Sequence, residues 1–226
     1  YQHNEEGIPY HPDGRKLVFL GDVVDRGTQS VLLLHYIEQA VRQGGHTFVV
    51  GNHEDKLLKT WDAWRRTGEA RGRSRSSTET FLSLMAHPMA EQERLMHFIR
   101  TQPHFALIEG HTGEQFACVH SDVRVFDPLW TPRSAVLYGD SDFGRLDSDA
   151  HYEMGYAKGW NRYTLLRGHI EQISPQRHVH SVEFDQAFAG HLAALRLDRF
   201  AAALASEPGA DGVRARELFE SCAVKV

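Results

Sequence analysis

Two short apolar runs, each ending in a polar loop that begins with glycine, constrain the fold of this chain more than any other feature. Residues 17–20 follow a turn at residues 12–14, and residues 47–50 follow a Gly-Gly pair. Between the runs, apolar residues recur at helical spacing over about residues 28–41, with Thr28 as the candidate N-cap. This pattern predicts a strand–helix–strand unit whose right-handed crossover brings both polar loops to one edge of a parallel sheet.

The first polar loop reads GDVVDRG at residues 21–27. Asp22 directly follows the strand, where a carboxylate can bridge two divalent ions that activate water for attack at phosphorus. Arg26 is a candidate to bind substrate phosphate through its planar guanidinium, and Asp25 is a candidate to orient a histidine. The loop therefore predicts part of a catalytic metal site.

The second polar loop reads GNHE at residues 51–54. Asn52 offers a carbonyl oxygen to a metal ion and is also a candidate phosphate-binding residue. His53 is suited to protonate a leaving-group oxygen, because histidine is the side chain that most readily exchanges a proton near neutral pH, and Glu54 is expected to cap the next helix. Each loop alone could be structural, but two such loops at the ends of paired strands favour a metal-dependent phosphoesterase.

Further elements are expected beyond Glu54. A helix is expected to follow it and to end at Gly68, and a helical insertion is expected over about residues 54–102, with a break near Pro88. The other expected elements are a hairpin of residues 105–108 and 115–119, an irregular lobe over residues 122–160, strands of a second sheet at residues 164–167, 179–184 and 192–197, and a terminal helix over residues 212–226.

The two motifs resemble the G-D-x-x-D-R-G and G-N-H-E signatures of the calcineurin-like metallophosphoesterases, in the branch of the phosphoprotein phosphatases. The resemblance implies an α/β (α+β) fold, a two-sheet β-sandwich flanked by helices, with a dinuclear metal centre. Residues 1–200 would form this domain, and residues 201–226 would be a C-terminal extension with a helix. Bacterial members implied by the resemblance are serine/threonine phosphatases, diadenosine tetraphosphatases and polynucleotide kinase-phosphatases.

The family places two more histidine ligands after later strands. His120 in Val-His-Ser and His169 in Gly-His fit these positions, although Ser121 stands where Gly or Ala is more usual. His111 in Gly-His-Thr matches the family wording but precedes His120 and lies in the expected hairpin turn, so it is set aside. Manganese is the metal implied by the resemblance, and iron or zinc would also suit mixed nitrogen and oxygen ligands.

The family's first motif, G-D-x-H-G, does not occur before residue 20. The expectation is that the sequence starts about one strand and one helix late, that the full-length protein holds two divalent ions, and that the fragment holds one. If the motif is truly lost, the alternative is a non-catalytic phosphate-binding module.

Three substrate classes remain open: phosphoproteins, dinucleoside polyphosphates and nucleic-acid phosphate ends. Two groups of basic residues are candidates to bind a polyanionic substrate: Arg71, Arg73 and Arg75, and Lys158, Arg162 and Arg167. A formal net charge of -5 argues against a stable nucleic-acid partner, and no apolar run is long enough for a membrane span. Two cysteines without disulfide spacing, Cys118 and Cys222, favour a cytoplasmic setting.

Overall fold

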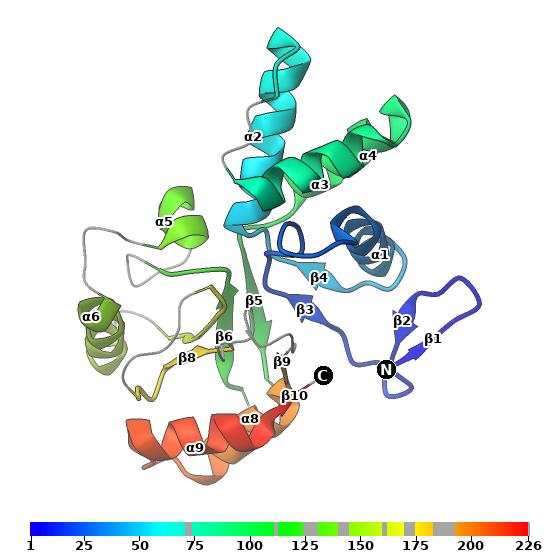
Figure 1. The fold of residues 1–226 in the computed structure, drawn as a ribbon. Coiled ribbons are helices and arrows are strands. Elements are labelled where there is room, and N and C mark those ends of the chain that lie inside the picture. Colours follow the sequence, from blue (N-terminus) through cyan, green and yellow to red (C-terminus); the bar gives the residue numbers. More distant parts are fainter. Residues whose placement is uncertain are drawn as a thin grey trace. The chain divides into compact units, whose positions relative to one another are not determined.

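The computed structural model describes residues 1–70, 74–110, 113–123, 131–139, 145–159, 162–169, 175–182 and 193–225. The chain divides into two compact units, Tyr1–Pro103 and His104–Val226, whose elements are labelled in Figure 1. Both units contain helices and strands, which confirms the predicted α/β class. None of the helices in the described ranges has the length and apolar character needed to cross a membrane.

The strand–helix–strand unit is present in the first unit. Strands β3 (Val18–Phe19) and β4 (Thr47–Phe48) pair in parallel, and α1 (Ser30–Arg42) connects them. This confirms the predicted crossover, although both strands are shorter than expected. The predicted cap at Thr28 is wrong, because α1 begins at Ser30 and the cap position is held by Gln29 without a side-chain hydrogen bond.

Three further helices complete the first unit: α2 (Asn52–Thr67), α3 (Arg75–Met85) and α4 (Met89–Thr101). The predicted break near Pro88 and the predicted stop at Gly68, which adopts φ +74°, are both confirmed. However, α2 begins two residues before Glu54 rather than after it. A small hairpin of β1 (Gln2–His3) and β2 (Pro9–Tyr10) precedes these elements.

The core of the first unit holds the ends of β3 and β4 in place. Leu34 and Ile37 of α1 are fully buried, and Phe48 of β4 stacks on Phe98 of α4 with ring centroids 5.9 Å apart. Burying one such side chain contributes roughly 1.5–3 kcal/mol. The polar loops that follow the strands therefore start from a rigid base.

The second unit contains a four-stranded sheet in the order β5 (Phe105–Glu109), β6 (Gln115–Val119), β7 (Thr164–Arg167), β8 (Val179–Ser181). The β5–β6 pair is antiparallel, as the predicted hairpin requires, and the other two pairs are parallel. Strands β7 and β8 extend the hairpin into a sheet that is distinct from the β3–β4 pair, as the prediction of a second sheet implies. Since β6 and β7 are parallel neighbours, the loops that follow them lie at the same edge of the sheet.

The lobe expected to be irregular contains two helices, α5 (Arg133–Tyr138) and α6 (Arg145–Ala157). Val136 of α5 and Tyr152 of α6 are buried in one cluster with Val119 and Leu165 of the sheet. Tertiary packing of this kind stabilises helices whose sequence periodicity is weak. This explains why the sequence alone did not predict them.

The C-terminal residues are part of the second unit. Strand β9 (Ala193–Leu195) pairs with β10 (Ala223–Lys225), and α8 (Leu197–Ser206) and α9 (Gly212–Cys222) lie between them in sequence. The predicted terminal helix therefore ends at Cys222 and is followed by a strand. The boundary expected at residue 200 falls inside α8.

Candidate active site

The GDVVDRG loop adopts a backbone conformation that side chains rarely allow. Asp22, Asp25 and Arg26 have φ values of +55°, +66° and +48°. Each left-handed residue other than glycine costs on the order of 1 kcal/mol or more, and such residues cluster at functional sites where surrounding contacts hold them. A specific set of contacts must therefore maintain the loop.

Glu54 supplies those contacts. The backbone N–H groups of Asp22 and Gly51 donate to its Oε2, both at 2.9 Å, and those of Val23 and Val24 donate to its Oε1 at 2.8 and 3.2 Å. Burial raises the pKa of Glu54 to about 7, the Asp22 carboxylate adds to the rise, and the backbone donors oppose it. Glu54 thus caps α2 as predicted, and it also holds the GDVVDRG loop, a role that the sequence analysis missed.

Gly51 allows the two loops to approach each other. A Cβ atom at this position would lie 2.5 Å from both the backbone nitrogen and the Oδ1 atom of Asp22. Atoms this close would clash, so any other residue would push the loops apart. The close approach of the two loops in space therefore requires glycine at position 51.

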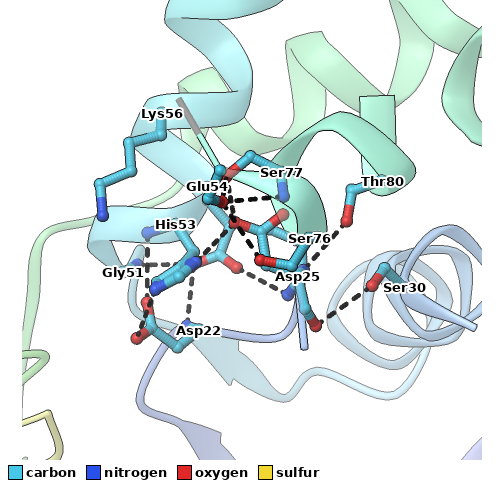
Figure 2. A network of polar contacts seen from close by, with 12 residues as sticks. Asp22, Asp25, Ser30, Gly51, His53, Glu54, Lys56, Ser76, Ser77 and Thr80 are labelled. Carbon is cyan, nitrogen blue, oxygen red and sulfur yellow. Dashed lines mark hydrogen bonds and ion pairs between the residues drawn. The ribbon is translucent and has the colours of Figure 1, made fainter. Parts of the chain in front are cut away.

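Asp25 and His53 form a hydrogen-bonded pair, shown in Figure 2. Their Oδ2 and Nδ1 atoms are 2.6 Å apart, and Asp25 is only 7% exposed. Ser77 Oγ also donates to Asp25 Oδ2 at 3.1 Å, while the Asp25 backbone N–H donates to Thr80 Oγ1 at 3.2 Å. The pair is therefore fixed from α3 as well as from the two loops.

These contacts set the ionisation of Asp25. Burial by itself raises the pKa of this carboxyl group, but hydrogen bonds from His53, Thr80 and Ser77 and the charge of His53 outweigh it, so the pKa is lowered. With an ionised Asp25 accepting from Nδ1–H, the other ring nitrogen of His53 is free to exchange a proton. That atom, Nε2, lies 3.8 Å from Asp22 Oδ2.

Asp22 and Asn52 supply oxygen atoms beside this pair. The His53 backbone N–H donates to Asp22 Oδ1 at 3.2 Å. Asn52 is 5% exposed, and its Oδ1 atom is buried without a hydrogen-bond partner among the described residues. Leaving a buried acceptor unsatisfied costs about 1–3 kcal/mol, unless another group, such as a cation, binds it. Arg26, the predicted phosphate-binding residue, is exposed.

His120 and His169, the two later histidines, lie together in the second unit. They follow β6 and β7, and their ring centroids are 4.8 Å apart. The Gly168 backbone N–H donates to the His120 carbonyl oxygen at 3.0 Å, which joins the two loops, and His169 adopts φ +56°. His111 lies outside the described residues, as do Arg71 and Arg73.

Arg167 has a different role from the one predicted. It is 1% exposed, and its Nη1 atom lies 2.8 Å from Asp149 Oδ1 and 3.4 Å from Asp122 Oδ1. A guanidinium buried against two carboxylates is not placed to bind substrate phosphate. The ion pairs instead join the end of β7 to α6 and to the loop after β6, next to both histidines.

The other basic candidates lie at the surface. Lys158 and Arg162 are exposed, and Arg75 pairs with Glu79 on α3 at 2.8 Å.

Metal-dependent phosphoester hydrolases use carboxylate, amide and imidazole side chains of this kind to bind their ions. The model of the family called "calcineurin-like phosphoesterase" matches residues 5–194, and the chain belongs to this family. It is therefore a hydrolase of phosphoester bonds, and membership implies divalent metal ions.

Curated relatives extend over most of the chain. The chain is 28% identical over 206 residues to the bis(5'-nucleosyl)-tetraphosphatase PrpE (asymmetrical) of Anoxybacillus flavithermus, covering 85% of this chain and 79% of the relative. It is 25% identical over 185 residues to the protein of the same name from Bacillus subtilis, covering 80% and 74%. A solved structure of a provisionally assigned diadenosine tetraphosphatase aligns with a TM-score of 0.56 and 16% identity over 82% of this chain and 78% of that one, which supports the fold.

The residues present fit the metal ions that the family implies. The buried Oδ1 of Asn52 needs a positively polarised partner, and the neighbouring Asp22 carboxylate provides negative charge. Within the second unit, His120 and His169 offer imidazole nitrogens, which bind transition metals.

Proposed function

We propose that this phosphoesterase hydrolyses dinucleoside polyphosphates and cleaves them asymmetrically. The curated relatives that carry the corresponding name align with 80–85% of the chain at 25–28% identity. The Asp25–His53 pair beside the Asp22 carboxylate is the structural observation that supports the proposal, because a histidine oriented by a carboxylate can donate a proton and a neighbouring carboxylate can bind a metal ion. A phosphate chain joined to two nucleosides is also a small polyanion, suited to an exposed arginine such as Arg26.

In this proposal, Asp22, Asn52, His120 and His169 hold the divalent ions. When bound, the ions supply a water molecule activated for attack and neutralise charge on the phosphate oxygens. Arg26, assisted by Asn52, binds the oxygens of the phosphoryl group that is attacked. Asp25 keeps the His53 ring oriented, and His53 Nε2 protonates the oxygen that leaves.

The proposed metal is manganese, and iron and zinc are alternatives compatible with the mixed nitrogen and oxygen ligand set. Metal-free protein reconstituted with one ion at a time identifies the ion that restores the highest kcat. We expect manganese to do so.

A substrate panel tests the proposed activity. Metal-loaded protein is incubated with diadenosine tetraphosphate, a phosphoserine peptide and a nucleoside 3′-phosphate, and the products are separated chromatographically. The proposal predicts the highest kcat/KM for the tetraphosphate, with ATP and AMP as products in equal amounts. ADP as the only nucleotide product would contradict the asymmetric cleavage, and a higher kcat/KM for the peptide or the 3′-phosphate would contradict the substrate class.

The proposal includes a cytoplasmic setting. Cys118 and Cys222 are both buried as free thiols. Free thiols persist most readily in a reducing compartment.

A further inference from the structure

A second group of metal-ligand side chains lies in the first unit, away from the two motif loops. It consists of His35 in the middle of α1, His87 in the turn between α3 and α4, and Glu91 in the first turn of α4. One ligand atom from each lies within 4.8 Å of the others. Two atoms that are each about 2.1 Å from one ion can be up to about 4.2 Å apart, so small side-chain rotations suffice for all three to bind it.

The three side chains of this group contact one another closely. His35 Nε2 is buried and lies 2.6 Å from Glu91 Oε1. His87 Nδ1 lies 3.2 Å from the other carboxylate oxygen, Glu91 Oε2. Two imidazoles and one carboxylate therefore converge from α1, the α3–α4 turn and α4, as the ligands of a cation do.

We propose that His35, His87 and Glu91 form a binding site for a divalent transition-metal ion, with zinc as the best match. Two imidazole nitrogens and one carboxylate are a donor set that zinc accepts, with water completing a tetrahedron. The three side chains are 17%, 33% and 30% exposed, so an ion reaches them from solvent.

The backbone around His87 is already fixed. The His87 N–H donates to the Leu84 carbonyl oxygen at 3.1 Å, and the Gln92 side chain donates to the His87 carbonyl oxygen at 2.8 Å. Little ordering entropy remains to be lost on binding. An ion here joins α1 to the α3–α4 turn and thereby stabilises the first unit.

Arg94 competes with the ion. Its Nη2 atom lies 2.9 Å from His35 Nδ1, the nitrogen that carries the proton when Nε2 binds metal. The same side chain pairs with the buried carboxylate of Glu38. On metal binding the guanidinium keeps its contact with Glu38 and gives up its contact with His35. A lysine at this position would keep a positive charge next to Glu38, but it has no second nitrogen to contact His35.

Metal counting tests the site. Metal-free full chain is equilibrated with zinc, dialysed, and analysed for bound metal by mass spectrometry. His87→Ala and Glu91→Gln should each bind one zinc ion fewer than the wild type. His97→Ala, which alters an exposed histidine on the same helix, should bind as many as the wild type. Retention of the wild-type count in both site variants would overturn the proposal.

A gain of affinity provides a second test that a folding defect cannot imitate. Arg94→Lys should lower the Kd for zinc at this site. If the contact between Arg94 and His35 contributes about 1.4 kcal/mol, the Kd falls roughly tenfold. The measurement is a calorimetric zinc titration of Arg94→Lys against the wild type, with Arg94→Lys/His87→Ala as the variant that lacks the site. Unchanged or weaker binding in Arg94→Lys would count against the site.

Discussion

Single residues explain how the two motif loops are built. The sequence predicted Asp22, Asp25, Asn52 and His53 as site residues because each lies in a short contiguous motif. It did not predict that Glu54 binds four backbone amides, since three of them are more than 29 residues away in the chain. A side chain that acts through distant backbone groups leaves no local pattern.

Glu54→Gln tests the loop anchor. The substitution replaces one carboxylate oxygen, which accepts hydrogen bonds from backbone N–H groups, with an amide NH2. The NH2 group is itself a donor and cannot accept these hydrogen bonds. We expect the free energy of unfolding to fall by about 1–3 kcal/mol, measured by urea denaturation. Glu93→Gln, which alters a half-exposed surface ion pair, is the matched control and should change the free energy of unfolding by less than about 0.5 kcal/mol. Similar values for the two variants would argue against the anchor.

His53→Ala tests the proton donor. Protonation matters most when the leaving group is basic, so we expect kcat for phenyl phosphate to fall by roughly 10²-fold or more. The loss should be smaller for p-nitrophenyl phosphate, because nitrophenolate leaves without a proton more readily. Equal losses on both substrates would contradict the role of His53 as an acid.

Elements that depend on tertiary contacts were predicted least well. The hairpin and the crossover were correct because their periodicity and turn residues are local. The placement of β7 beside β6 depends on pairing between segments more than 40 residues apart, which periodicity does not encode. Arg167 joins β7 to α6 and to the loop after β6, and its sequence position alone suggested a phosphate-binding role.

Removing Arg167 should destabilise the second unit. Arg167→Ala leaves Asp122 and Asp149 buried without their countercharge, and burial already raises the pKa of Asp149. Breaking a buried pair in this way costs about 3–5 kcal/mol. The check is chemical denaturation of the full chain. A loss below about 1 kcal/mol would show that the pairs do not support the loops that carry His120 and His169.

His180 makes the packing of α8 and α9 on the sheet dependent on pH. Its ring stacks on Phe219 and meets Phe200 edge-on, and burial lowers its pKa from 6.5 to about 4. Between these pH values the unfolded chain binds a proton that the folded chain does not, so stability falls as pH decreases from 6.5 towards 4. The full effect is on the order of 3 kcal/mol.

Denaturation of wild type and His180→Phe at several pH values isolates this contribution. The stability difference between the two proteins should shift in favour of His180→Phe as pH falls through this range. A difference that is constant from pH 7.5 to pH 4.5 would contradict the assignment.

At the scale of the whole molecule, the family was predictable because two motifs at the ends of parallel strands rarely arise together. The organisation of the chain was less predictable. Its two compact units meet in sequence at residues 103 and 104, whereas composition changes little there. The C-terminal strand β10 pairs with β9, so the last residues complete the second unit through a contact that is remote in sequence.

The central claim is that Asp22 binds metal, whereas His53 donates a proton and does not. Measuring both the metal content and kcat of variants at these two residues tests this claim most directly. Asp22→Ala should lose both bound metal and activity, because Asp22 is the proposed shared ligand. His53→Ala should keep its metal and lose activity on substrates with basic leaving groups. Equal metal loss in the two variants, or activity retained by Asp22→Ala, would contradict the account.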